Sequence, residues 1–120
     1  MTKAKKPTRA QLEAIGGKFW ERDDMRRVYF DDLPGFLGYD FAYYNTGNIS
    51  AAWYAGEVIS NSDGRRVQSM LNGAKFFYDL SADEWSARFF NQHDKDCLLP
   101  DLIRAAQDKI EGLENKGVSE

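Results

Sequence analysis

Histidine and cysteine are nearly absent from this chain of 120 residues, which contains one of each. The single Cys97 excludes a disulfide within the chain, so we expect a reducing compartment. A zinc site needs three or four ligands in one place, and His93 and Cys97 have no second imidazole or thiol to complete it. A Cys97 nucleophile with His93 as its base is the alternative, but nothing beside the pair matches a catalytic signature. We therefore expect no metal, no cofactor and no enzyme activity.

Long apolar runs and phosphate-binding glycine patterns are missing as well. No run approaches the eighteen or so apolar residues of a membrane span, and the basic segment MTKAKKPTRAQ is not followed by the apolar stretch of a secretory signal. Neither GxGxxG nor GxxxxGK followed by Ser or Thr occurs. Adjacent carboxylates occur at 23–24, 31–32 and 83–84, but sequence neighbours do not face each other across a cleft. We expect a cytoplasmic protein without membrane contact.

Positive charge is in deficit, with 16 Lys and Arg against 19 Asp and Glu, a net charge of −3 and a pI near 5.2. This balance argues against binding that depends mainly on phosphate neutralisation, although a local basic face remains possible. Hydrophobic residues at 42% and aromatic residues at 14% are typical of a globular chain. The length predicts one domain over residues 8–115, with a flexible basic tail at 1–7 and a loose C-terminus at 116–120.

The stretch from 39 to 61 predicts a three-stranded meander around which the rest is organised. Apolar and polar residues alternate over 39–44, and the alternation restarts over 49–54. Between them, residues 45–48 are Asn, Thr, Gly and Asn, which tolerate the backbone angles of a reversal. Gly56 predicts a second reversal, followed by a short third strand.

The remaining segments predict more helices and hairpins. Before the meander we expect a helix capped by Thr8 and ended by Gly16-Gly17, strands at 18–21 and 27–31, and a loop or single helical turn at 31–38. After it we expect a helix at about 63–72, strands at 75–79 and 84–90, and a polar loop at 91–96. The last predicted element is a helix from Leu99 to about 113, with Pro100 in its first turn. Ser81 and Glu84 also match a capping box, so a helix opening there is the alternative to the last strand. The predicted class is α+β, a mostly antiparallel sheet of hairpins and meander with helices on one face and a C-terminal amphipathic helix.

One set of residues recurs along the chain at a constant offset. Arg9, Gln11, Gly16, Lys18 and Phe19 return as Arg66, Gln68, Gly73, Lys75 and Phe76. Two helix-plus-hairpin units flanking the meander in one mixed sheet would explain the recurrence, and chance over so short a window is the alternative.

Aromatic residues are dense in the predicted strands, and arginines and lysines lie among them. Because helices from so short a chain cover only one face of a sheet, we expect rings on the other face, although core packing is the alternative for many of them. Tyr, Trp and Arg concentrate binding energy at interfaces. The predicted contact residues are Arg27, Tyr29, Tyr44, Trp53, Tyr54 and Arg66. Rings beside cations also suit single-stranded nucleic acid, although the acidic residues of the same hairpins dilute a positive field.

A group of short motifs resembles small proteins carried by bacteriophages and integrating mobile elements. The motifs are Gly17-Lys18 with Trp20, Arg27-Val28-Tyr29-Phe30, the run from Tyr44 to Ser50, Gly56-Glu57, Ser60-Asn61-Ser62 and Tyr78-Asp79. The resemblance spans roughly residues 16 to 80 and transfers no catalytic residue.

What the resemblance implies is a biological setting. A non-enzymatic protein of this kind acts in the host cytosol by binding a host protein or nucleoprotein complex, for example as an inhibitor of a CRISPR defence system. The alternative is a regulatory module that binds single-stranded nucleic acid or DNA, and a homodimer through the helix at 99–113 is a third possibility.

Overall fold

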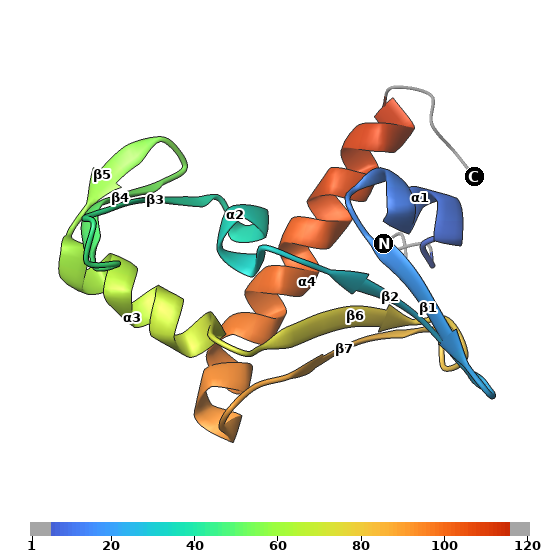
Figure 1. Cartoon of the computed structure of the whole chain (residues 1–120). Helices are drawn as coiled ribbons and strands as arrows, with labels where there is room; N and C mark the ends of the chain where they lie inside the picture. Colours follow the sequence, from blue (N-terminus) through green and yellow to red (C-terminus); the bar gives the residue numbers. More distant parts are fainter. Residues whose placement is uncertain (1–5, 116–120) are drawn as a thin grey trace.

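The computed structural model of the chain describes residues 6–115. Residues 1–5 of the predicted tail at 1–7, and the predicted loose C-terminus at 116–120, lie outside the described residues. Four helices and seven strands follow in the order α1 (Arg9–Ala14), β1 (Lys18–Arg22), β2 (Met25–Phe30), α2 (Leu33–Leu37), β3 (Tyr39–Tyr43), β4 (Ile49–Tyr54), β5 (Glu57–Ile59), α3 (Asn61–Leu71), β6 (Lys75–Asp79), β7 (Glu84–Arg88) and α4 (Gln92–Asn115) (Figure 1). The predicted α+β class, with antiparallel hairpins, a meander and a long C-terminal helix, is confirmed.

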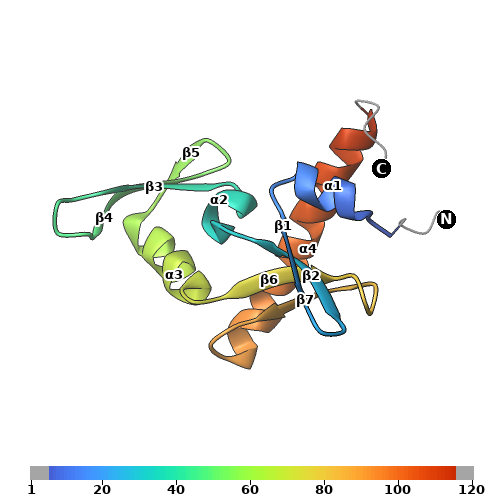
Figure 2. The same ribbon diagram turned by 45° about the vertical axis from the view of Figure 1, so that its right-hand side comes forward.

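The strands form two separate antiparallel sheets rather than the single sheet that we expected (Figure 2). Sheet A has the order β1-β2-β6-β7, and sheet B is the meander β3-β4-β5. The separation arises after β2, where Asp32 takes a left-handed backbone conformation and its carboxylate caps α2. This short helix turns the chain away from sheet A, and the free edge of β2 pairs with β6 instead.

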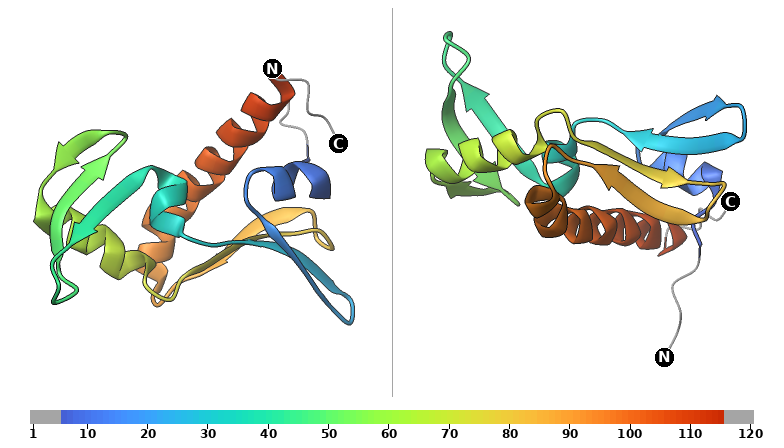
Figure 3. Two further views of the ribbon diagram at one scale, coloured as in Figure 1. Left: turned by 45° about the horizontal axis from the view of Figure 1, so that its top comes forward. Right: turned by 90° about the horizontal axis from the view of Figure 1, so that it is seen from below.

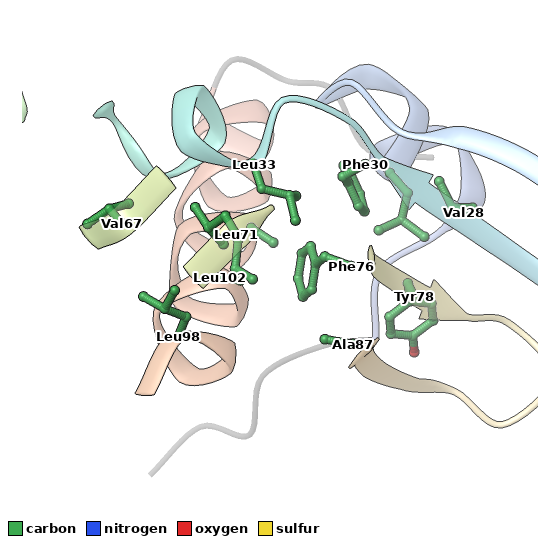
Figure 4. Packing of buried hydrophobic residues seen from close by; sticks show 12 residues of the cluster. Val28, Phe30, Leu33, Val67, Leu71, Phe76, Tyr78, Ala87, Leu98 and Leu102 are labelled. Carbon is green, nitrogen blue, oxygen red and sulfur yellow. The ribbon is translucent and has the colours of Figure 1, made fainter. Parts of the chain in front are cut away.

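The main core lies on one face of sheet A, beneath α1 and α4. Val28, Phe30, Phe76 and Tyr78 alternate along the two central strands and are buried against the helices. Figure 4 shows Phe76 beside Leu102 of α4 and Leu71 of α3, with Phe30, Val28 and Tyr78 farther along the two strands. Phe76 also stacks on Trp85, with 5.2 Å between the ring centroids and 4° between the ring planes.

Sheet B is attached to the rest of the chain by α3. Gly64 in the first turns of this helix lies so close to β4 that a Cβ there would stand 2.7 Å from the Cβ of Ala52 and 3.3 Å from the ring of Phe41. The absence of a side chain at Gly64 therefore sets how closely the helix approaches the sheet.

Both predicted helix-plus-hairpin units are present, each with a glycine between its helix and its hairpin. In the first unit, Thr8 and Gln11 form a complete capping box at the start of α1. The second unit comprises α3 and the hairpin β6-β7, which ends at Arg88. Asp83 takes a positive φ in the tight turn before β7, so the strand prediction for this segment is confirmed and the helix alternative is wrong.

The predicted polar loop at 91–96 is wrong, because α4 already begins at Gln92. The Asn91 side chain accepts a hydrogen bond from the Asp94 amide at 2.8 Å, which caps the helix start. Pro100 is therefore the ninth of 24 helical residues and lies outside the first turn. The apolar stripe of α4 packs on the core of its own chain, with Leu102 and Ala106 fully buried, and a homodimer stays a prediction. Within residues 6–115, no helix combines the length and apolar character that crossing a membrane would require.

Candidate binding face on the four-stranded sheet

Within residues 6–115, no helix covers the side of sheet A opposite the core, and we call this side the open face (Figure 3). Strand alternation from the buried Val28 and Phe76 assigns its residues, and the register aligns them across the four strands. They are Lys18, Trp20, Arg22, Met25, Arg27, Tyr29, Lys75, Phe77, Asp79, Glu84, Ser86 and Arg88.

Three rings and one arginine form the centre of the open face. Tyr29 lies between Trp20 and Phe77, with centroid distances of 6.0 Å and 4.9 Å. The Arg27 guanidinium lies over the Phe77 ring, 4.4 Å from its centroid, and donates a hydrogen bond to the Tyr29 hydroxyl at 3.0 Å. Phe77 is consequently only 7% exposed, whereas Trp20 at the sheet edge is 36% exposed. Trp20 is therefore the accessible ring surface, and Arg27 is held in place by its neighbours.

The charge of the open face has the opposite sign to that of the whole chain. Counting Asp31, which continues the alternation of β2, the face has five cationic side chains and three carboxylates, whereas acidic residues are in excess overall. One carboxylate, Asp79, accepts hydrogen bonds from the backbone amides of Ser81 and Ala82 and so belongs to the hairpin turn. Among the described residues, no ion pair forms at Arg22, Arg27, Lys75 or Arg88.

Of the charged residues on the open face, Lys18 and Asp31 do form an ion pair. The Lys18 ammonium lies 2.7 Å from the Asp31 carboxylate, and this hydrogen bond, with the attraction between the charges, lowers the pKa of Asp31 and raises that of Lys18. Lys75 lowers the pKa of Asp31 further through its positive charge.

Two hollows extend from the open face and share Phe77 and Arg88. The larger, about 660 Å³, lies between the sheet and the C-terminal end of α3. We call it the α3 groove; its lining includes Trp20, Tyr29, Gln68, Asn72 and Lys75. The second, about 420 Å³, lies beside the edge strand β7 and is lined by Arg27, Lys95 and Phe90 among others. Phe90 is 91% exposed, and no carboxylate lines this second hollow.

The structure brings together only two of the six predicted contact residues, Arg27 and Tyr29. Tyr44 is exposed at the β3–β4 turn. Trp53 lies on the side of β4 that faces away from α3, since the adjacent Ala52 meets Gly64. Tyr54 packs on Tyr39 with 4.6 Å between the ring centroids.

The sixth predicted residue, Arg66, is exposed on α3, where its guanidinium lies 3.8 Å from the Asp63 carboxylate. Trp20, Lys75, Phe77 and Arg88 were not among the predicted contacts. The sequence shows which side of its own strand each of these residues occupies. It does not show that β2 pairs with β6, and this pairing is what brings them onto one face.

His93 and Cys97 are both exposed on the first turns of α4, and the sulfur lies 3.7 Å from Nε2 of the ring. Within the part of the chain that the structure describes, no group of three His, Cys, Asp or Glu side chains is placed to hold a metal ion.

No protein family, curated protein or solved structure matches this chain, so the interpretation of the open face depends on its geometry.

Proposed function

We propose that this chain is a non-enzymatic binding protein that contacts single-stranded nucleic acid, free or within a nucleoprotein complex, through the open face of sheet A. The observation that supports the proposal is the position of Arg22, Arg27, Lys75 and Arg88, which have no ion pair among the described residues, on the same open face as the partly exposed Trp20, in an otherwise acidic chain. Bases stack on aromatic rings whatever their identity, and cations follow the phosphates between them.

The chemistry of each side chain fits a different part of such a strand. Trp20 presents ring surface for a base, whereas Lys75 and Arg88 are exposed and directly opposite in the β6–β7 register. Arg27 is fixed on Phe77, so it supplies positive charge without losing further side-chain entropy on binding.

The experiment is a fluorescence-anisotropy titration of labelled single strands of about 16 nucleotides, DNA and RNA, at about 50 mM salt, where phosphate contacts are strong. We expect Trp20→Ala to weaken binding by about 5- to 150-fold, the loss that one stacked base gives. We expect Arg88→Ala to reduce the salt dependence by about one phosphate contact.

Matched controls come from side chains outside the open face. Trp53→Ala removes a tryptophan from sheet B, and Arg65→Ala removes an exposed arginine from α3; neither substitution should change the affinity. Thermal unfolding of each variant shows whether the fold is retained. The proposal fails if no strand binds at low salt, or if Trp53→Ala weakens binding as much as Trp20→Ala does.

A second function, inhibition of a host defence complex by protein contact, has its own support. The resemblance to proteins of bacteriophages and mobile elements implies this setting, and sheet B exposes Tyr44, Tyr54 and Val58, the last at 77%. Affinity capture with the purified chain against CRISPR effector complexes tests it. Retention of an effector that Trp53→Ala and Tyr44→Ala abolish, and Trp20→Ala does not, is the expected result. Failure to retain any effector would remove this form of the idea.

A further inference from the structure

The α3 groove is a hollow with two walls at the edge of the open face. One wall is formed by Trp20, Tyr29 and Phe77, and the other by the end of α3 with the turn that follows it, residues 71–74. Its volume of about 660 Å³ is within the range of small-molecule sites in proteins, about 300–1,000 Å³. A planar group wider than a side chain can therefore enter between the sheet and the helix end.

Two positively charged side chains occupy paired positions on neighbouring strands at the rim of the α3 groove. Lys75 and Arg88 are directly opposite each other on β6 and β7, and both line the groove. Like charges opposite each other across strands destabilise a sheet. Within residues 6–115 neither side chain has an ion-pair partner. Two carboxylates also line the groove: Asp31 is paired with Lys18, and Asp32 accepts a hydrogen bond from the Gly35 amide at the start of α2. An anion that bridges the two cations would relieve the repulsion.

The far wall of the α3 groove provides hydrogen-bonding groups suited to a base edge. The Gln68 amide nitrogen donates to the Tyr43 hydroxyl at 3.0 Å, which orients the amide. Asn72 is exposed and has no side-chain hydrogen bond among the described residues. Amide side chains both donate and accept, as recognition of an unpaired base requires.

We propose that the α3 groove is a nucleotide site, in which one unpaired base lies against Trp20 and Tyr29 with its edge toward Gln68 and Asn72, and its phosphate lies between Lys75 and Arg88. The inference depends on the proposed function and adds to it a specific position for one base. The strand then continues over Arg27 and Arg88 into the second hollow, where Lys95 supplies a further cation.

The first test is an NMR titration of the ¹⁵N-labelled chain with a nucleoside 5′-monophosphate, with inorganic phosphate and with a short single strand. The monophosphate and the strand should shift the amide signals of residues 72–74 as well as those of Lys75 and Arg88. Inorganic phosphate should shift only the signals of the two cationic residues.

The second test blocks the α3 groove without changing the strands. Asn72→Trp places a large ring at its exposed wall, and we expect the affinity for the single strand to fall by about 5- to 150-fold, the contribution of one stacked base. Ser69→Trp is the control, since Ser69 is exposed on the same helix but does not line the groove.

The outcomes separate this inference from the proposed function. If a strand binds and shifts the signals of Trp20 and Arg27 but not those of residues 72–74, the nucleotide site is wrong and the proposed function stands. The same holds if Asn72→Trp binds as tightly as the unmodified chain. If no strand binds at all, both are wrong.

Discussion

Replacement of Gly64 by alanine tests how sheet B is attached to α3. An alanine Cβ at this position would lie 2.7 Å from the Cβ of Ala52, closer than side-chain carbons approach in proteins, and 3.7 Å from Cδ1 of Ile49. Gly64 has no positive φ, so the substitution does not strain the backbone angles. Overpacking of a close contact costs about 1–3 kcal/mol, while replacing glycine within a helix contributes about 1 kcal/mol in the opposite direction.

Gly112→Ala is the matched control. Gly112 is also helical, in α4, and no atom of the described residues lies within 4 Å of a Cβ built there. The helix-propensity gain is common to both variants, so the free energy of unfolding should differ between them by about 1–3 kcal/mol, the overpacking alone. Gly112→Ala should be more stable than the unmodified chain by about 0.5–1 kcal/mol.

Urea unfolding followed by circular dichroism measures the three free energies, and equal slopes of the transitions show that the unfolded states are comparable. If Gly64→Ala is as stable as Gly112→Ala, the close packing of α3 on β4 is refuted.

Two further predictions concern α4 and the edge of sheet A. Pro100→Ala restores the backbone amide that can donate to the Asp96 carbonyl, and it removes the ring that crowds this carbonyl. The free energy of unfolding in urea should therefore rise by up to about 3 kcal/mol. An unchanged free energy of unfolding would mean that α4 is not continuous at Pro100. Lys18→Met should raise the pKa of Asp31 toward its ordinary value, because the hydrogen bond and the positive charge that lower it are lost. Since the pKa of Asp31 is lowered by folding, its contribution to stability is present above about pH 4 and is lost as the pH falls further. Carboxyl ¹³C shifts followed over pH measure the difference, and an Asp31 titration that Lys18→Met does not move would contradict the ion pair.

Local chemistry predicted most of the elements. The cap at Thr8, the reversal at 45–48 and the turn at Gly56 each depend on residues a few positions apart, and each appears where it was expected. The start of α4 was missed because its first turn is polar and has no apolar periodicity. The Asn91 cap is sufficient to begin a helix whose stability comes from Leu102 and Ala106 farther along.

The arrangement of the sheets could not be predicted in the same way. Alternation assigns Arg27 and Tyr29 to one face of their strand, but it does not say that β6 lies beside them. That neighbour is distant in the sequence, and pairings of this kind are not encoded in short windows. Four of the six predicted contact residues consequently lie away from the open face, on sheet B and on α3.

The position of α3 has a mechanical consequence for the whole molecule. Its first turns are fixed to sheet B at Gly64, and its last residues form a wall beside sheet A. In the described part of the chain no backbone ladder joins the two sheets. A helix is stiff along its axis because each turn is hydrogen-bonded to the next. Because Val67 and Leu71 pack in the main core while Gly64 packs on β4, α3 holds sheet B at a fixed distance from sheet A.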